Sequence, residues 1–431
     1  MQTPPADTRS GLRILAVSPV YWPCVGGGER LLGTILERLV ERGHEATVLT
    51  TDAARHPDMF GTTGAGLPPR EARNGVQIQR IAPGGGFVGK VARRVNRMRG
   101  VHRSLQAITA GLSEGATALP SPLGFLPALL RVQADVVLTA NWWSAVPVVA
   151  AYVANTRRIP VVSLPLLHIE RPWATRRVLR RVLPLCARTV ALTPSEAAHE
   201  RSLGARRTAV IGGAIDAEWG RSADGVALRR RHGLGDHPVV AFVGRQDEFK
   251  GAPTLIRAMR LVWQQRPDAR LMLAGQSAHR DGVTKAALEA LVPEERERVV
   301  EVDDFTDAEA PDVFAACDVL AQPSIEESFG LVLIEAWMMG RPVIGASIPA
   351  TRDLVNDAED GLIVPPADPP ALADAILRLV ASPETRARMG ERGRAKVLAQ
   401  YTTSTMIDAW ESLLLDVGPV LRGRQRTPPT A

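Results

Sequence analysis

The chain has 431 residues, of which 45% are hydrophobic and 23% charged, with a formal net charge of +6. This balance is ordinary for a globular protein, and the length exceeds what one compact core usually contains, so we expect two domains. The composition excludes a membrane-spanning protein, because no apolar run reaches the roughly 18 residues that a transmembrane helix needs.

The cysteines and the N-terminus indicate a compartment. Three scattered cysteines without metal-binding spacing are typical of reduced thiols in a cytosolic protein. Residues 1–10 are polar and lack the pattern of a signal peptide. We therefore expect a cytoplasmic location.

Charge divides the chain into two unlike halves. Residues 1–210 contain 27 Lys and Arg against 13 Asp and Glu, whereas the remainder contains 25 against 33. Different charge predicts different partners for the two domains. Nucleic acid is not expected as a partner, since no helix-turn-helix, RNP-like or zinc-finger pattern occurs and aromatic residues make up only 4%.

The first half alternates apolar strands with helices. Arg13–Ser18 is a predicted strand, a glycine-rich loop follows, and Glu29–Arg42 has helical apolar spacing before Glu45–Asp52 forms the next strand. This order of elements builds a doubly wound parallel sheet. Further strands are predicted at 134–139, 159–164 and 189–193, with loops at 53–75 and 83–90, and residues 210–216 are expected to end the first domain.

The second half repeats the alternation more regularly. The last helical pattern, Thr402–Leu415, is amphipathic, and a helix is also predicted at Ala371–Ala381. Strands are predicted near 238–244, 269–275, 298–303, 317–322, 342–346 and 361–364.

Two carboxylates, Glu327 and Glu335, lie on either side of a short turn that opens into a helix. Free N–H groups at the helix start, together with the helix dipole, favour an anion such as the phosphate of a sugar nucleotide. The two carboxylates can accept hydrogen bonds from sugar and ribose hydroxyls. The segment predicts donor contacts from Glu327, Ser328, Phe329, Gly330, Leu331 and Glu335.

A second motif, Gly244–Gly251, lies about 80 residues upstream and follows an apolar strand. Arg245 and Lys250 on one strand-to-helix loop can clamp a diphosphate, because a guanidinium binds two oxygens at once and an ammonium adds a compact charge. Gly244 allows a close approach of the backbone. Taken alone, the motif also fits an ordinary loop with solvated charges.

Together these motifs resemble the family-4 retaining glycosyltransferases of the GT-B fold. Gly244–Gly251 matches the family pattern G-R-x-x-x-x-K-G, and Glu327 with Glu335 matches its E-x7-E. Weaker matches at Gly26–Glu29, Gly340–Gly345 and Gly361–Pro365 follow in the family's order. The resemblance covers most of the chain and is sharper in the second half.

The resemblance implies an α/β chain with two Rossmann-like, doubly wound parallel-sheet domains that face each other across a cleft. Residues 1–212 are then the acceptor-binding domain and 213–399 the nucleotide-sugar-binding domain, with a C-terminal helix at 400–420 that packs back on the first. The linker departs from the family at Gly213–Asp216, where an Asn-Gly is usual, and Ser328 stands where Gly is frequent.

Several first-domain residues are candidates with open alternatives. His168 follows a predicted strand, and in the family a His here contacts the donor sugar; a structural hydrogen bond is the alternative. Gly27 and Gly28 can let a phosphate or acceptor reach the start of a helix, or form only a tight turn. Asn141–Trp143 suits either stacking on a sugar or a core role.

Basic segments raise the question of a membrane. Residues 88–108 combine helical apolar spacing with six Lys and Arg, as in helices that bind anionic lipid surfaces. A core-packed surface helix with a solvated charged face is the alternative, and it is slightly favoured. Arg176–Arg181 holds a second basic cluster, so phosphate-bearing or lipid-linked acceptors, and a peripheral place at the inner face of the plasma membrane, are open alternatives.

The sequence thus predicts retaining transfer of a hexosyl group from a UDP- or GDP-linked sugar to a hydroxyl of a glycan, lipid or small molecule. The predicted catalytic residues are His168, Arg245, Lys250 and Glu327. Neither a metal nor a cofactor is expected, because the Arg–Lys pair can neutralise the diphosphate. Base contacts are expected from loops after Ala274 and near Phe305.

Three other functions remain as alternatives. A sugar-nucleotide epimerase on the same fold would need further acid and base carboxylates. A phosphorylase would need a lysine for pyridoxal phosphate, and only Lys250 of the four lysines is well placed. A non-catalytic sugar-nucleotide-binding protein would have no need of the full set of charged residues.

Overall fold

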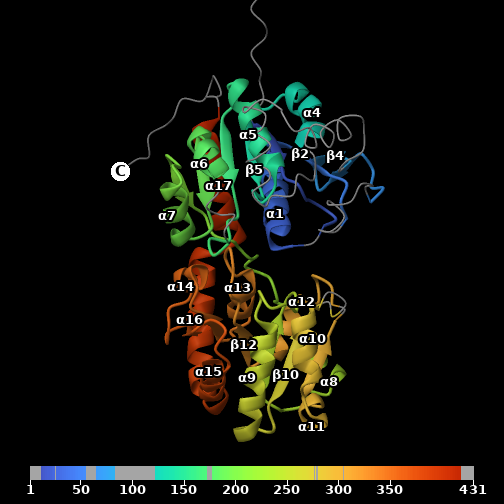
Figure 1. Cartoon of the computed structure of the whole chain (residues 1–431), viewed down its shortest axis with the longest axis vertical. Coiled ribbons are helices and arrows are strands. Elements are labelled where there is room, and N and C mark those ends of the chain that lie inside the picture. The colour runs from blue at the N-terminus through green and yellow to red at the C-terminus, as the bar shows by residue number, and fades with distance from the viewer. Residues whose placement is uncertain are drawn as a thin grey trace, which may run out of the picture.

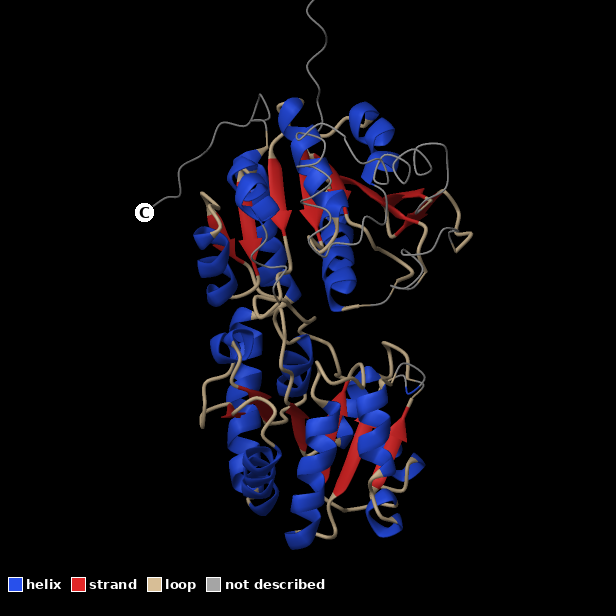
Figure 2. Cartoon of the chain, in the orientation of Figure 1, coloured by secondary structure: helices blue, strands red, loops and turns tan. Residues whose placement is uncertain are grey.

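A computed structural model describes residues 11–24, 26–54, 65–82, 122–171, 177–275, 277, 280–303 and 305–418. They form two α/β domains, each built on one sheet with helices packed against it (Figure 1, Figure 2). We call the part that contains the sheet β1–β8 the first domain and the part that contains β9–β14 the second. The predicted fold class is confirmed.

The first sheet has the strand order β3-β4-β2-β1-β5-β6-β7-β8, and only β3 and β4 pair antiparallel. Its strands are β1 Arg13–Val17, β2 Glu45–Thr51, β3 Arg70–Arg73, β4 Val76–Ile81, β5 Val136–Ala140, β6 Val161–Leu164, β7 Arg188–Ala191 and β8 Thr208–Val210. Its helices are α1 Gly27–Glu41, α4 Leu126–Arg131, α5 Ala145–Thr156, α6 Arg177–Val182 and α7 Pro194–Ser202, with short 3-10 turns at Pro122–Phe125 and Leu183–Leu185.

Both edges of this sheet differ from the prediction. The expected loop 53–75 is wrong for Arg70–Arg73, which is strand β3, and β4 and β8 were not predicted. Strand β3 carries no large apolar side chain and no buried residue, so it lacks the hydrophobic signal of a strand. Its backbone pairing with β4 supplies the structure instead.

The second sheet has the order β11-β10-β9-β12-β13-β14 and is parallel throughout. All six of its strands lie where the sequence predicted them, because buried parallel strands give short, continuous apolar runs. They are β9 Val239–Val243, β10 Arg270–Ala274, β11 Val299–Val302, β12 Val319–Gln322, β13 Val343–Ala346 and β14 Gly361–Val364.

The helices of the second half include α17, which returns to the first domain (Figure 1). Their bounds are α8 Gly225–Arg231, α9 Ala252–Gln265, α10 Gly282–Glu289, α11 Pro293–Arg296, α12 Ala310–Ala316, α13 Leu331–Met338, α14 Pro349–Leu354, α15 Pro369–Ala381, α16 Pro383–Gln400 and α17 Thr403–Val417.

Helix α17 is fixed to the first domain by both apolar and polar contacts. Trp410 on α17 is 1% exposed. The imidazole of His44 links Leu12, which precedes β1, to Glu411 on α17. Its Nδ1 accepts the N–H of Leu12 at 3.1 Å, and its Nε2 lies 3.1 Å from Oε1 of Glu411 on α17. His44 therefore has a structural role.

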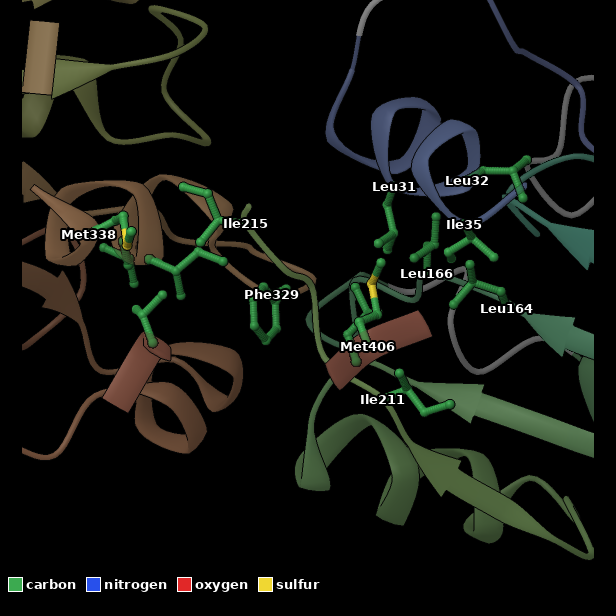
Figure 3. Packing of buried hydrophobic residues seen from close by; sticks show 14 of the residues in the cluster. Leu31, Leu32, Ile35, Leu164, Leu166, Ile211, Ile215, Phe329, Met338 and Met406 are labelled. Carbon is green, nitrogen blue, oxygen red and sulfur yellow. The ribbon is translucent and has the colours of Figure 1, made fainter. Parts of the chain in front are cut away.

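Each sheet buries both of its faces. Along β1, Ile14 and Ala16 belong to one hydrophobic cluster, whereas Leu15 and Val17 belong to another, as the alternation of side chains in a strand requires. The first of these clusters continues into the second domain, and Figure 3 shows its members Leu166, Ile211, Met406 and Phe329 near the junction. The two domains thus share one apolar contact region.

None of the helices in the described part of the chain has the length and apolar character that crossing a bilayer requires. The basic segment 88–108 and Arg176 lie outside the described residues.

Candidate functional site

The two charged motifs meet at the carboxyl end of the second sheet. Strands β9 and β12 are neighbours, so the loops that follow them lie side by side. Gly251 has φ +84, and a Cβ there would lie 2.2 Å from the carbonyl oxygen of Pro323. The N–H of Ile325 donates to the carbonyl of Phe249 at 2.9 Å. Glycine at 251 is therefore what allows the loops to touch.

Lys250 and Glu327 form the centre of this contact. The ammonium Nζ of Lys250 lies 2.7 Å from Oε2 of Glu327, and their side chains are 21% and 14% exposed. Burial acts to raise the pKa of Glu327, but the charge and hydrogen bond of Lys250 outweigh it, and the pKa ends below its usual value. The carboxylate is therefore ionised at neutral pH.

Arg245 lies on the same loop with its side chain 66% exposed, and Nη2 is 3.3 Å from Oδ2 of Asp247. Gly244, with φ +130, turns the chain out of β9. The next residue, Gln246, is buried and donates to the carbonyl of Gly275 at 3.0 Å. The loop is anchored by Gln246 and presents Arg245 to solvent.

Helix α13 begins immediately after Gly330, which has φ +100. Phe329 is 4% exposed and packs edge-on against the ring of Tyr401, with 5.6 Å between centroids. The Phe329 side chain is thus part of the core, so the predicted donor contact does not come from this ring. Leu331 points its Cδ1 toward Gly27, 3.6 Å from where a Cβ at Gly27 would lie.

Glu335 lies in the second turn of α13 and is 9% exposed. Burial raises the pKa of this carboxyl, with a smaller opposing effect from Arg30. The Nη2 of Arg30 on α1 is 3.7 Å from Oε1 of Glu335, and Nη1 is 4.0 Å from Asp307. Arg30 therefore reaches from the first domain to the carboxylate that the sequence assigns to ribose, and sequence reasoning missed it.

The start of α1, which contains Gly27 and Gly28, packs closely against the loops that follow β5 and β6. A Cβ at Gly28 would lie 2.7 Å from Cδ1 of Leu166 and 3.0 Å from Oδ1 of Asn141. Asn141 itself has φ +59, and its Nδ2 donates to Oγ of Ser18 at 3.0 Å and to Glu29 at 3.3 Å. Close packing is thus a demonstrated reason for glycine at 28.

Trp142 is a core residue. It is 3% exposed, and its Nε1 donates to Oγ1 of Thr139 at 3.1 Å. The alternative of sugar stacking does not hold for this side chain.

His168 lies at the junction of the two domains. Its Nε2 is 3.1 Å from Oγ of Ser328, which belongs to the second domain. Burial lowers the pKa of His168 below its usual value, so the imidazole is neutral at pH 7. Position 328, where the family often has Gly, therefore carries a hydroxyl that contacts a predicted catalytic residue.

A buried glutamate fixes the loop that carries His168. Glu196 is 2% exposed, and its two oxygens accept the N–H groups of Leu167 at 2.6 Å and Leu192 at 2.7 Å. Burial raises the pKa of Glu196 to about 7. Sequence reasoning missed this residue; its only local signal is its place in the first turn of α7, after the Thr193 cap.

The structure thus brings most of the predicted residues to facing ends of the two sheets. Lys250 with Glu327 and His168 with Ser328 are in direct contact. Arg245 shares the Lys250 loop and pairs with Asp247, and Glu335 lies beside Arg30.

A cavity of about 290 Å³ lies elsewhere, between α8, the end of β11 and the start of α12. Phe305, near which base contacts were expected, is among its lining residues, but none of the predicted charged residues lines it. The Lys250–Glu327 and His168–Ser328 contacts lie outside this cavity. Within the described residues, no group of three or more His, Cys, Asp or Glu could hold a metal ion.

Each half of the chain matches a model of a known protein family. Residues 25–219 match the family model "Glycosyltransferase Family 4", and residues 227–396 match "Glycosyl transferases group 1". The D-inositol 3-phosphate glycosyltransferase of Kribbella flavida is 30% identical over 325 residues, covering 67% of this chain and 75% of that protein. The chain belongs to the family-4 glycosyltransferases.

Other members of the family match over shorter regions. The alpha-D-kanosaminyltransferase of Streptomyces kanamyceticus is 31% identical over 193 residues, or 44% of this chain. The chain spans 49% of that relative and 40% of the D-inositol 3-phosphate glycosyltransferase of Corynebacterium glutamicum.

A solved structure shares the fold over nearly the whole length. Anabaena HepE, solved in complex with UDP-glucose, superposes with a TM-score of 0.70 and 19% identity, covering 94% of this chain and 100% of that one. The likeness establishes the two-domain GT-B fold for this family-4 chain.

Proposed function

We propose that the chain transfers a hexosyl group from a UDP- or GDP-linked sugar to a hydroxyl acceptor, with retention at the anomeric carbon. The observation that carries the proposal is the Lys250–Glu327 contact, which lies at the carboxyl end of a parallel sheet. Ligands of open α/β sheets bind at that end. The names of the relatives, all glycosyltransferases, support the reaction class.

In this proposal Arg245 and Lys250 bind the diphosphate and neutralise the charge that develops as the bond between sugar carbon and phosphate oxygen breaks. Preorganised charges of this kind usually supply the largest share of catalysis. The exposed guanidinium of Arg245 can leave Asp247 for a phosphate oxygen. The HepE complex with UDP-glucose supports a donor of this class.

Glu327 and Glu335 would hold the hydroxyls of the donor. Glu327 is ionised at neutral pH, so it accepts hydrogen bonds from sugar hydroxyls. Glu335 would accept from the ribose once a nucleotide enters beside Arg30. The first N–H groups of α13, after Gly330, would face the diphosphate, where the helix dipole favours negative charge.

His168 would contact the sugar near its reacting carbon. A neutral imidazole can donate or accept one hydrogen bond without placing a second positive charge beside the developing oxocarbenium ion. Gly27 would let the donor or the acceptor approach the start of α1, since this glycine is exposed. The acceptor attacks on the face that the diphosphate leaves, which retains the configuration.

We propose further that residues 213–399 bind the donor and residues 1–212 the acceptor, and that Arg245 and Lys250 make a metal and a cofactor unnecessary. The excess of basic residues in the first half supports an acceptor with phosphate or another acidic group, glycan or lipid-linked. For such an acceptor the chain would work in the cytoplasm, at or near the inner face of the plasma membrane.

A donor screen tests the proposal. The protein is incubated with UDP-glucose, UDP-N-acetylglucosamine, GDP-mannose and ADP-glucose, each with a set of hydroxyl acceptors that includes inositol phosphate and lipid phosphates. Release of one nucleoside diphosphate together with a glycosylated product is expected, and NMR of that product should show the donor's anomeric configuration. No nucleotide release from any donor, or an inverted product, would contradict it.

A further inference from the structure

Three consecutive residues of the β12 loop each contact a different partner. Glu326 binds Arg171, Glu327 binds Lys250, and Ser328 binds His168. Arg171 and His168 belong to the first domain and lie on one loop after β6. The β12 loop is therefore attached to both domains within three residues, and the Arg171 contact is absent from the motifs that identify the family.

Arg171 binds Glu326 with two parallel hydrogen bonds. Its Nη2 donates to Oε1 at 2.5 Å, and its Nε donates to Oε2. The side chain of Glu326 is only 9% exposed, whereas that of Arg171 is 37% exposed. A buried carboxylate that lost its partner would be strongly destabilised, so the pair is expected to stay closed.

The same guanidinium also covers the ring of Phe249, with 4.2 Å between its carbon and the ring centroid. Phe249 precedes Lys250 directly, and its carbonyl accepts the N–H of Ile325. At its other end, the backbone N–H of Arg171 donates to the carbonyl of His168 at 2.9 Å. One residue thus contacts the loops that carry His168, Lys250 and Glu327.

Only a planar guanidinium can make all of these contacts. It binds a carboxylate along one edge and stacks on an aromatic ring with its face, which a lysine ammonium does not do. Losing the stack would free the Phe249–Lys250 end of one loop, and losing the pair would free Glu326. Both changes would alter the position of Glu327 relative to His168.

We propose that Arg171 is a positioning residue for sugar transfer: through Glu326 and Phe249 it fixes the arrangement in which His168 lies beside the loop of the Lys250–Glu327 pair. The inference rests on the proposed function. It adds a residue that sets the relative positions of the reacting groups without contacting the donor.

The experiment compares Arg171→Glu, Glu326→Arg, the double charge swap and Arg171→Lys. Turnover is followed as UDP released from UDP-glucose or GDP released from GDP-mannose, and UDP and GDP binding are measured by calorimetry. Arg13→Lys is the matched control, because Arg13 binds Asp135 through the same two nitrogens, Nε at 3.1 Å and Nη2 at 2.6 Å, within the first domain.

Each single charge reversal is expected to lower kcat about 10- to 100-fold, because small displacements of reacting groups cost this much. The swap should lose much less than the product of the two single losses, since the pair is restored. Arg171→Lys should fall between wild type and Arg171→Glu. The stoichiometry of nucleotide binding should stay at the wild-type value, because Arg245 and Lys250 are intact.

Two results would overturn the inference. One is a swap whose loss equals the product of the single losses; the other is a binding stoichiometry that falls in step with kcat, which would mean that the substitutions only unfold the protein. If Arg171→Glu turns over like Arg13→Lys, Arg171 has no positioning role, although the proposed function stands. If wild type releases no nucleotide from any donor, the proposed function itself fails.

Discussion

The carboxyl ends of the two sheets differ in what they present. At the second sheet, charged side chains stand on glycine-bounded loops, as Lys250 and Glu327 do. At the first sheet the chain presents constrained backbone: Asn141 and Leu166 follow neighbouring strands β5 and β6 with φ +59 and +55. Left-handed backbone at residues other than glycine is held only where surrounding contacts determine it.

This difference assigns unlike tasks to the two domains. The second sheet supplies charge, and its loops are short enough to be set by local sequence. The first sheet supplies shape, through the closely packed Gly28 and the buried carboxylate of Glu196. Substitutions in the second domain should therefore mainly lower the rate of catalysis. Substitutions in the first domain should mainly change the positions of the site residues and the free energy of unfolding.

The largest effect is expected for Lys250→Ala. The substitution removes the ammonium that neutralises the diphosphate and leaves Glu327 buried without its cation, so kcat/KM should fall about 100- to 1,000-fold. Nucleotide release from the donor found by the screen measures it. Lys285→Ala on the exposed face of α10 is the matched control, and equal losses in the two variants would refute the role of Lys250.

Substitutions at the adjacent residues Gly27 and Gly28 separate a role in packing from a role in ligand approach. Gly28→Ala should lower the free energy of unfolding by about 1–3 kcal/mol, because the new Cβ overpacks against Leu166 and Asn141. Gly27→Ala should leave stability unchanged, since its Cβ would meet Leu331 at an ordinary 3.6 Å.

Chemical denaturation measures both variants, and kcat/KM separates the two roles. If phosphate approaches the backbone at 27, Gly27→Ala loses activity at full stability. Full activity in Gly27→Ala would show that phosphate does not approach the backbone at this position.

A smaller effect is expected at the contact between the domains. Ser328→Ala removes the hydroxyl next to Nε2 of His168, and kcat should fall about 2- to 10-fold, as for loss of one neutral hydrogen bond. Ser202→Ala removes an exposed hydroxyl that bonds only the carbonyl of His199 on its own helix, and it should have no effect. A Ser328→Ala enzyme as fast as wild type would show that the contact is incidental.

The smallest expected effect is a change of pH dependence at Glu196. Its folded pKa, about 7, lies above the ordinary value of 4.5, so its contribution to stability is complete below about pH 4.5 and is lost as pH rises through 7. In Glu196→Gln the fall in stability between pH 5 and pH 8 should be smaller than in wild type. Unfolding curves at both pH values test this, with the exposed Glu297→Gln as control; an unchanged slope would contradict it.

The sequence predicts the second domain better than the first for a physical reason. Lys250 and Glu327 lie on loops, and Glu335 in the helix that follows one of them. Nearby glycines and apolar strands set the course of these segments, so spacing alone locates the three residues. Phe329 shows the limit of spacing. The motif predicts a donor contact for this residue, whereas the structure places its side chain in the core against Tyr401.

The residues that sequence reasoning missed act over long distances along the chain. Arg171 meets Glu326 across 155 positions, and Arg30 meets Glu335 only because α1 faces α13. Strand β3 was missed because it has no large apolar side chain and no buried residue. The basic segment 88–108 stays a prediction, outside the described residues.

The most direct test of the central claim is calorimetric titration of UDP, GDP, ADP and TDP into wild type and Lys250→Ala. We expect one of these nucleotides to bind wild type at one site per chain and to bind Lys250→Ala at least about 10-fold more weakly, as for loss of a charged hydrogen bond. Equal binding to both proteins, or no binding of any nucleotide to wild type, would contradict it.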